Sequence, residues 1–195
     1  MKTLGETDYQ DAAKVLKIDV ALIKAVAEVE SAGTGFIGDG GEYDGYPKIL
    51  FEGHKFHAYT SGRFDFDHPS ISYPVWTKKY YLGGSAEYKR LNIAKSLDLD
   101  AALRATSWGK FQIMGFNFVG CGYKSVLSFV HDMHLSEGIQ LMAFIKLIKH
   151  EGWDVYLKVK DFEMFAYHYN GKGYKANQYD VKLKKAYEIY SGVAV

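Results

Sequence analysis

The sequence lacks the features that mark disulfide-rich, exported or membrane-spanning proteins. Its single cysteine, Cys121, cannot form an internal disulfide, which points to a reducing compartment and to a small core or loop residue. No apolar run reaches the roughly 18 residues that a membrane-spanning helix needs. The first residues carry no apolar stretch behind Lys2, so we expect neither a signal peptide nor a stable membrane anchor.

An excess of charge of one sign is also absent. The 24 basic residues nearly balance the 23 acidic ones, so no basic surface is available for binding nucleic acid. Only three prolines occur, so long helices can run without interruption. Because there is no repeat or linker, we expect the 195 residues to form one domain over 1–195 with a core large enough to fold without a metal.

Helical spacing of apolar residues dominates what is present. It predicts an all-helical or helix-dominated α+β domain. The expected helices cover 8–16, 20–31, 52–60, 85–97, 100–106, 125–133, 136–150, 162–169 and 179–190. Thr7 and Asp19 are the expected N-caps of the first two helices, and 49–51 is expected to be a short strand. Six glycines between 33 and 47 predict a loop.

Glu30 continues an apolar stripe on the second expected helix. It follows Ile23, Val26 and Ala27 at offsets of three, four and seven residues, which place all four on one face. Burial and the negative end of the helix dipole would both raise the pKa of this carboxyl, as a general acid at neutral pH requires. The alternative is a boundary glutamate whose carboxyl reaches water.

Two later segments hold polar side chains among apolar neighbours. Gln112 follows Gly109 in a glycine-aromatic stretch and could offer a donor and an acceptor to a sugar, or could instead hold a loop together. Tyr169 ends an apolar helical stripe, and Asn170 and Gly171 then form a helix stop. Taken alone, Asn170 is best explained as a cap.

Four motifs in order resemble a known family. These are Val29-Glu30-Ser31, the segment ILFEGHKF at 49–56, the segment SWGKFQIM at 107–114, and Tyr169-Asn170-Gly171. Their order is similar to that of the goose-type lysozyme and lytic transglycosylase superfamily, and most of all to the N-acetylmuramidase domain of phage endolysins. The resemblance covers the chain from about residue 22 to residue 190.

The resemblance implies a lysozyme-like fold with a glycan-binding cleft and Glu30 as the catalytic acid. It also implies that Gln112, Tyr169 and Asn170 line the cleft, and we group Ser31 of the first motif with them as substrate-binding. The implied activity is cleavage of the bond between N-acetylmuramic acid and N-acetylglucosamine in peptidoglycan, with no cofactor and no metal. The small cell-wall-binding domain often joined to this family is not visible, so we expect a catalytic module alone, as a monomer.

Glu52 is the candidate second carboxylate. It follows the glycine-rich loop by a few residues, so the chain could fold back and bring it across a cleft from Glu30. A separation of roughly 5–5.5 Å would fit a retaining nucleophile, and roughly 6.5–9.5 Å a base that activates water. We favour the water-activating or positioning role; the alternative is that Glu52 caps the helix that follows it.

Three other functions stay open. A lytic transglycosylase would form a 1,6-anhydro sugar with one acid, and a non-catalytic cell-wall binding module would have no use for Glu30. A structural phage protein would predict repeats or heptads, which the sequence lacks. For a phage lysis protein without an export signal, we expect residence in the host cytoplasm until a holin-type membrane lesion releases it to the cell wall.

Overall fold

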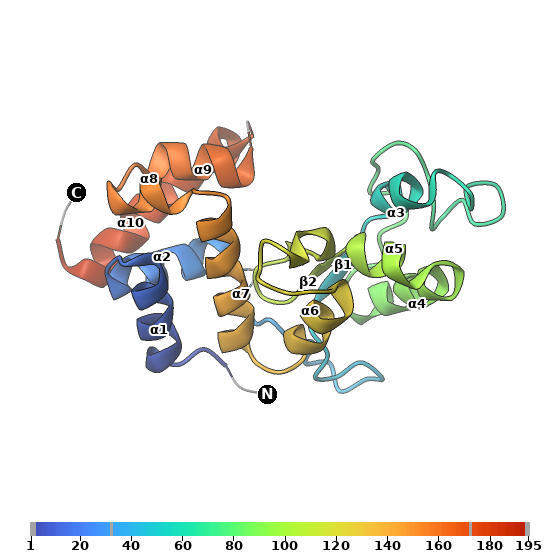
Figure 1. Cartoon of the computed structure of the whole chain (residues 1–195), viewed down its shortest axis with the longest axis horizontal. Coiled ribbons are helices and arrows are strands. Elements are labelled where there is room, and N and C mark those ends of the chain that lie inside the picture. Colours follow the sequence, from blue (N-terminus) through green and yellow to red (C-terminus); the bar gives the residue numbers. More distant parts are fainter. Residues whose placement is uncertain (1–2, 32, 172, 194–195) are drawn as a thin grey trace.

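Helices make up most of the molecule, as the sequence predicted (Figure 1). The computed structural model describes residues 3–31, 33–171 and 173–193. The α-helices in these ranges are α1 (Glu6–Leu16), α2 (Val20–Glu30), α3 (Gly53–Thr60), α4 (Glu87–Leu97), α5 (Leu99–Arg104), α6 (Val126–Met133), α7 (Glu137–His150), α8 (Asp154–Lys158), α9 (Phe162–Asn170) and α10 (Tyr179–Ser191). Short 3-10 helices are η1 (Gly84–Ala86), η2 (Gly115–Phe118) and η3 (Tyr174–Asn177). The helix-dominated α+β class is therefore confirmed.

One small antiparallel sheet is formed by β1 (Ile49–Phe51), β2 (Thr106–Trp108) and β3 (Ile113–Met114), in that order. The strand predicted at 49–51 is confirmed, and its central residue Leu50 pairs with Ser107. The other two strands were not predicted. All three residues of β2 are buried, so the strand shows none of the alternation that marks a half-exposed strand.

Helix boundaries follow the capping side chains. Asp19 caps α2 as predicted, because its Oδ1 accepts the Leu22 amide at 2.7 Å. The prediction for α1 was wrong by two residues: Gly5 is the N-cap, and its amide donates to Asp8 Oδ2 at 2.8 Å. Ser125 and Ser136, expected as first helical residues, are instead the N-caps of α6 and α7.

Three more expectations need correction. The helix expected over 85–97 begins as the 3-10 turn η1 and becomes α-helical at Glu87. The helix expected to reach Thr106 ends at Arg104, since Thr106 already pairs with Phe51 in the sheet. The short helix α8 was not predicted, because five residues are too few for a periodic pattern to emerge.

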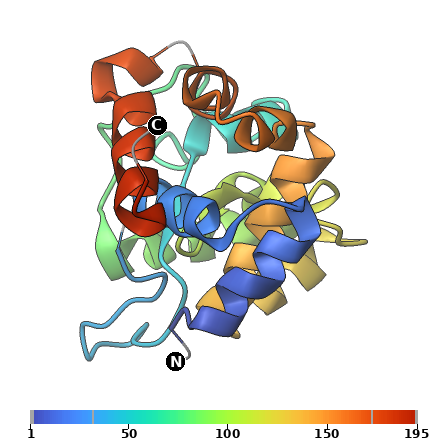
Figure 2. The same ribbon diagram turned by 90° about the vertical axis from the view of Figure 1, so that its left-hand side faces the viewer.

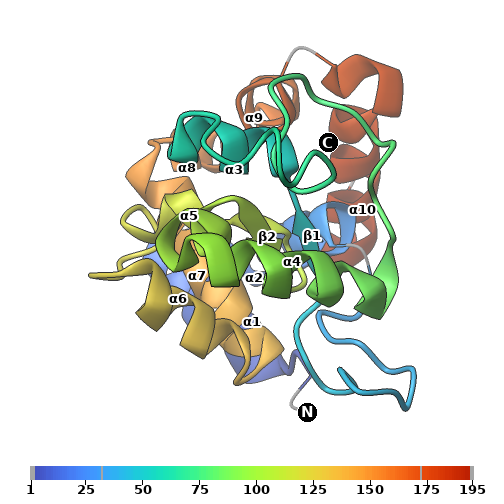
Figure 3. The same cartoon turned by 90° about the vertical axis from the view of Figure 1, so that its right-hand side faces the viewer.

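The helices gather in two groups with the sheet between them. In Figure 1, α1, α2, α8, α9 and α10 lie on the left, α3, α4 and α5 lie on the right, and α7 stands between the left group and the sheet. Figure 2 shows α10 against α2 and α1 against α7, and both pairs are packed together. Figure 3 shows α4 and α5 beside the strands at the other end.

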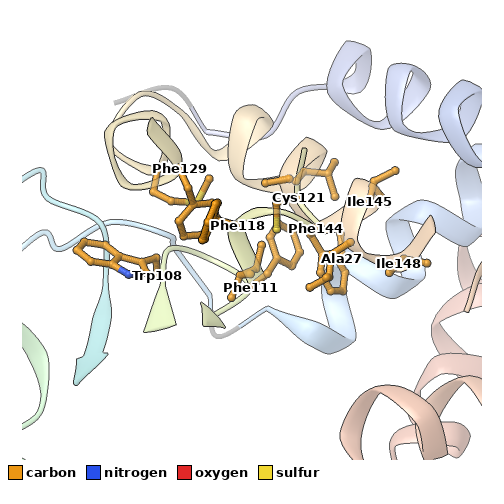
Figure 4. Close-up of a cluster of buried hydrophobic side chains, with 14 of the residues drawn as sticks. Ala27, Trp108, Phe111, Phe118, Cys121, Phe129, Phe144, Ile145 and Ile148 are labelled. Carbon is orange, nitrogen blue, oxygen red and sulfur yellow. The ribbon is translucent and has the colours of Figure 1, made fainter. Parts of the chain in front are cut away.

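A single hydrophobic core runs through the centre of the molecule (Figure 4). Phe111, just before β3, stacks on Phe144 of α7 with ring centroids 4.7 Å apart. Cys121 is fully buried beside them, and burial raises the pKa of its thiol to about 12, so it is a core residue. Each fully buried phenylalanine contributes about 2–3 kcal/mol. Among the helices described, none is long and apolar enough to span a bilayer.

Candidate active site

A cavity of about 630 Å³ opens between the group of helices that holds α2, α9 and α10 and the β2–β3 turn. It lies at the end of α2, beside the β2–β3 turn and against α7, α9 and the start of α10. The residues that line it are Val29, Glu30, Ser31, Phe111, Gln112, Ile113, Met114, Asn117, Leu147, Trp153, Tyr169, Asn170 and Tyr179. All the site residues expected from the sequence except Glu52 are among them.

Glu30 is the last residue of α2 and the only carboxylic acid among the described residues that line this cavity. Its Oε1 accepts a hydrogen bond from Asn170 Nδ2 at 3.2 Å. Burial raises the pKa of Glu30 from 4.5 to about 7, and the Asn170 hydrogen bond acts weakly in the opposite direction. A carboxyl with this pKa is protonated in about half of the molecules at neutral pH.

The sequence of α2 explains why Glu30 is held this way. Ile23, Val26 and Ala27 are all buried, so the predicted apolar stripe directs Glu30 toward the core side of the helix. Glu28 points elsewhere and accepts a hydrogen bond from Tyr190 at 2.6 Å. The last turn of α2 has no basic residue, so nothing there offsets the helix dipole at Glu30.

The end of α9 forms the opposite wall. The Tyr169 ring packs edge-on against Phe144 and Trp153, with centroids 5.2 and 5.8 Å away. Burial raises the pKa of the Tyr169 hydroxyl, and the nearby Glu30 carboxylate adds to this. Asn170 is the last helical residue, and Gly171 is the C-cap. The Asn170 amide therefore bonds across the cavity to Glu30, where a cap alone had been the simplest explanation.

Gln112 lines the cavity but uses its amide to hold the surrounding loop. Its Oε1 accepts from Ser107 Oγ at 2.8 Å, and its Nε2 donates to the carbonyls of Gly109 and Lys48 at 2.8 and 3.2 Å. Its φ of +46° lies in the left-handed region. Both donor hydrogens are thus engaged within the protein, which supports the loop-holding alternative and leaves one acceptor position on Oε1 for a ligand.

Sequence reasoning missed several lining residues. Ser31, in extended conformation at the C-cap of α2, was expected, whereas Met114, Asn117, Trp153 and Tyr179 were not. Asn117 follows the Gln112 segment closely enough that the extension of that motif could have suggested it. Trp153 and Tyr179 come from parts of the chain without a motif, and only the packing of α8 and α10 brings them to the cavity.

Glu52 lies elsewhere, at the junction of β1 and α3. Its Oε2 accepts a 2.5 Å hydrogen bond from the Tyr81 hydroxyl. His54 Nδ1 lies 3.3 Å from the same oxygen, without the geometry of a hydrogen bond, and burial lowers the pKa of His54. Glu52 occupies the N-cap position of α3, but its side chain makes no capping hydrogen bond. The structure therefore does not bring Glu52 into the Glu30 cavity, and it does not make Glu52 a side-chain cap either.

Comparison with known proteins identifies the family. The family model described as N-acetylmuramidase matches residues 19–191. The crystal structure of Burkholderia AP3 phage endolysin is similar, with a TM-score of 0.90 and 39% sequence identity over 98% of this chain and 73% of that chain. A search of the curated proteins found no match. Because the family match includes both walls of the cavity, from Glu30 to Asn170, and nearly all of the chain, this protein belongs to the N-acetylmuramidase family.

Proposed function

We propose that the chain is a peptidoglycan hydrolase that cleaves the glycosidic bond between N-acetylmuramic acid and N-acetylglucosamine. Membership of the N-acetylmuramidase family supports peptidoglycan glycan as the substrate. Likeness to a phage endolysin supports a role in lysis of a bacterial host. Within this proposal the chain acts on the cell wall after release through a membrane lesion, alone and without a cofactor.

The observation that carries the proposal is the state of Glu30. It is a carboxylic acid at the end of a helix, inside a cavity of about 630 Å³, with a pKa raised by burial to about 7. A general acid works best when its pKa lies near the working pH, because it must both hold and release a proton. Nothing else among the described residues of the cavity wall offers a carboxyl.

Glu30 would protonate the glycosidic oxygen as the bond breaks. Because the Asn170 amide donates to Oε1, the neutral carboxyl carries its proton on Oε2, which is free to give it to the leaving oxygen. Burial of Glu30 beside Tyr169 and the apolar part of the cavity wall reduces the contact of the carboxyl with water. Reduced contact with water keeps the pKa of Glu30 high, so more of the carboxyl is protonated near neutral pH.

Glu52 remains our proposal for the second carboxylate, in a water-activating or positioning role. Tyr81 holds one of its oxygens in a fixed direction, and its side chain is still 16% exposed. A base that activates water has to be oriented and reachable by solvent, and the contact with Tyr81 and the exposed fraction suit that role. Its absence from the wall of the Glu30 cavity means that the substrate and a water would have to bridge the two carboxyls.

The decisive experiment is digestion of purified peptidoglycan followed by mass spectrometry of the released muropeptides. Hydrolysis at N-acetylmuramic acid should give reducing N-acetylmuramic acid ends with wild-type protein and none with Glu30→Gln. Release of reducing N-acetylglucosamine ends, or equal activity of the variant, would overturn the proposal.

A lytic transglycosylase is the second candidate, and one observation favours it. Glu30 has no carboxylate partner among the described residues that line its cavity, and a transglycosylase needs a single acid. In that reaction Glu30 gives its proton to the leaving oxygen, and the resulting carboxylate takes the proton of the C6 hydroxyl as that hydroxyl attacks C1 of its own N-acetylmuramic acid. The products would then be anhydro-muropeptides, each one water lighter than the hydrolysis product, in the same mass spectra.

A further inference from the structure

A buried ion pair lies behind the Glu30 cavity and takes no part in lining it. It joins Lys110, in the β2–β3 turn, to Glu137, the first residue of α7, with 3.4 Å between Nζ and Oε2. The Glu137 side chain is 3% exposed and that of Lys110 is 13% exposed. Charges buried to this degree are costly unless they are well paired, so their presence asks for an explanation.

The pair fastens the loop that follows α2. Glu137 Oε1 accepts the amide of Gly35 at 2.7 Å, and the Lys110 ammonium donates to the carbonyl of Gly33. Glu137 Oε2 also accepts the amide of Leu4 at 3.2 Å. The loop that begins just after Glu30 and Ser31 is therefore held by both members of the pair.

Lys110 also holds the β2–β3 turn, which carries Gln112, against α7. The amide of Lys110 donates to Gln140 Oε1 at 2.7 Å, and Gln140 Nε2 donates to the Met133 carbonyl at 2.8 Å. Phe111 and Gln112, the next two residues after Lys110, line the cavity. One cluster thus sets the position of two separate segments of the cavity wall.

The backbone at Gly35 and Gly109 packs tightly against the Gln140 side chain. A Cβ at Gly35 would lie 2.3 Å from Gln140 Oε1, and one at Gly109 would lie 2.6 Å from Gln140 Cδ. Helical hydrogen bonds cannot steady the chain beyond Glu30, because Ser31 is already extended. Lys110 and Glu137 therefore hold the start of the segment after Glu30, and the Lys48 amide, which donates to the Gly35 carbonyl at 2.9 Å, holds it from the other side.

We propose that Lys110 and Glu137 are positioning residues that fix the end of α2 and the β2–β3 turn around Glu30, and so keep water from its carboxyl. This inference rests on the proposed role of Glu30 as the acid. Lys110 and Glu137 contact neither the cavity nor, by this proposal, the substrate. They affect the reaction only by setting the position of Glu30.

The test compares Lys110→Met, Glu137→Gln and the double variant with the wild type. The double variant matters most, since it removes a charge pair of zero net charge and leaves no buried charge alone. Glu30 is titrated directly in the full chain by carbon-13 NMR of labelled glutamate carboxyls, with its signal assigned by its loss in Glu30→Gln. Tyr169 and Tyr179 are the other titratable groups among the described residues of the cavity wall, and neither carries a carboxyl that this label reports.

We expect the titration midpoint of Glu30 to fall by about one pH unit in the double variant, because water reaches the carboxyl. On soluble peptidoglycan fragments, kcat should fall about tenfold while KM stays within about twofold. Lys110→Arg, which can keep both contacts, should restore the midpoint. Lys24→Met is the matched control: it breaks the ion pair that Lys24 of α2 makes with Glu6 of α1 and should leave the midpoint unchanged.

An unchanged midpoint in the folded double variant overturns the inference. If its melting temperature falls at the same time, the pair stabilises the fold without positioning Glu30. A shifted midpoint in a protein that does not cleave peptidoglycan overturns the proposed function and leaves the positioning role standing. A midpoint that shifts in Lys110→Met but not in the double variant would also count against positioning. The shift would then come from the unpaired charge of Glu137.

Discussion

The two candidate carboxyls, Glu30 and Glu52, sit in opposite surroundings. Glu30 has one neutral amide donor at 3.2 Å and lies in a cavity whose wall mixes apolar and uncharged polar side chains. Glu52 has a hydroxyl donor at 2.5 Å and an imidazole 3.3 Å away. The first setting favours a carboxyl that keeps its proton, and the second favours one that is oriented by a hydroxyl donor. The contrast teaches that the partners of a glutamate, more than its motif, indicate which proton role it can take.

The largest effect should come from Glu30→Gln. Glutamine keeps the size of the side chain and an acceptor for Asn170 but has no proton to give, so lytic activity should fall by about two orders of magnitude or more. Turbidity loss of a peptidoglycan suspension measures this, and circular dichroism checks the fold. Glu28→Gln, on the same helix but bonded to Tyr190 at the surface, is the matched control and should keep full activity. A folded Glu30→Gln with near wild-type activity would contradict the role of Glu30 as the acid, and with it the difference between Glu30 and Glu52.

The pH profile should carry the signature of Glu30. Its pKa of about 7 means that the acid loses its proton as pH rises through that value. Activity should therefore fall by about tenfold for each pH unit above 7, or about a hundredfold by pH 9. Initial rates from pH 5 to pH 9 at constant ionic strength give the profile. A flat profile to pH 9 would contradict the acid role.

Stability should change with pH in the matching direction. The folded state binds the Glu30 proton more tightly than the unfolded chain, where the pKa returns to 4.5, so this group favours folding at low pH and the benefit is lost between about pH 4.5 and 7. Above pH 7 the buried carboxylate costs about 3 kcal/mol, which Glu30→Gln removes. Urea unfolding should show the variant to be more stable than wild type at pH 8 and no more stable at pH 4.

Glu52→Gln tests the proposed water-activating role of the second carboxyl. The amide still accepts from Tyr81 but cannot take a proton from water, so hydrolysis should fall about tenfold or more while binding to insoluble peptidoglycan is kept. Rates on peptidoglycan and a pull-down with the same material give the two readouts. Tyr81→Phe, which frees the carboxyl without neutralising it, should lose less. Full activity of Glu52→Gln would favour the single-acid mechanism and its anhydro products.

The smallest effect on turnover is expected at Gln112. Its three side-chain hydrogen bonds hold the β2–β3 turn, so Gln112→Ala should lower the free energy of unfolding by about 2–3 kcal/mol. Activity of the folded fraction should stay within about threefold, since the donors never reach the substrate. Asn117→Ala, on the same cavity wall, is the comparison variant and should show the reverse balance. A Gln112→Ala protein that melts like wild type yet has lost activity would restore the sugar-binding interpretation.

Local patterns were enough to predict the helix that bears Glu30. The stripe of Ile23, Val26 and Ala27 and the cap at Asp19 act over neighbouring turns, and the structure has both. The fold class followed from the same periodicity. The family resemblance added the members of the opposite wall, Tyr169 and Asn170, which line the cavity.

Interactions between distant segments could not be predicted. The strand β2 is buried throughout although it reads Thr106-Ser107-Trp108, so neither an alternating pattern nor an apolar run marks it in the sequence. Gln112 bonds to the carbonyl of Lys48, 64 positions earlier, and no spacing in the sequence announces a backbone partner. The Lys110–Glu137 pair is invisible for the same reason: charged residues in a sequence are expected at the surface, and only the packing of α7 against the turn buries them.

The Asn170–Glu30 hydrogen bond joins residues 140 positions apart, and this affects when the enzyme can first work. A ribosome releases Glu30 long before it reaches α9, so the acid spends most of translation without its amide donor or the Tyr169 wall. The cavity closes only after α9 has been made and has packed beside α2 and α7. With Glu30 in its proposed role, catalysis therefore begins only after nearly the whole chain has been made and folded.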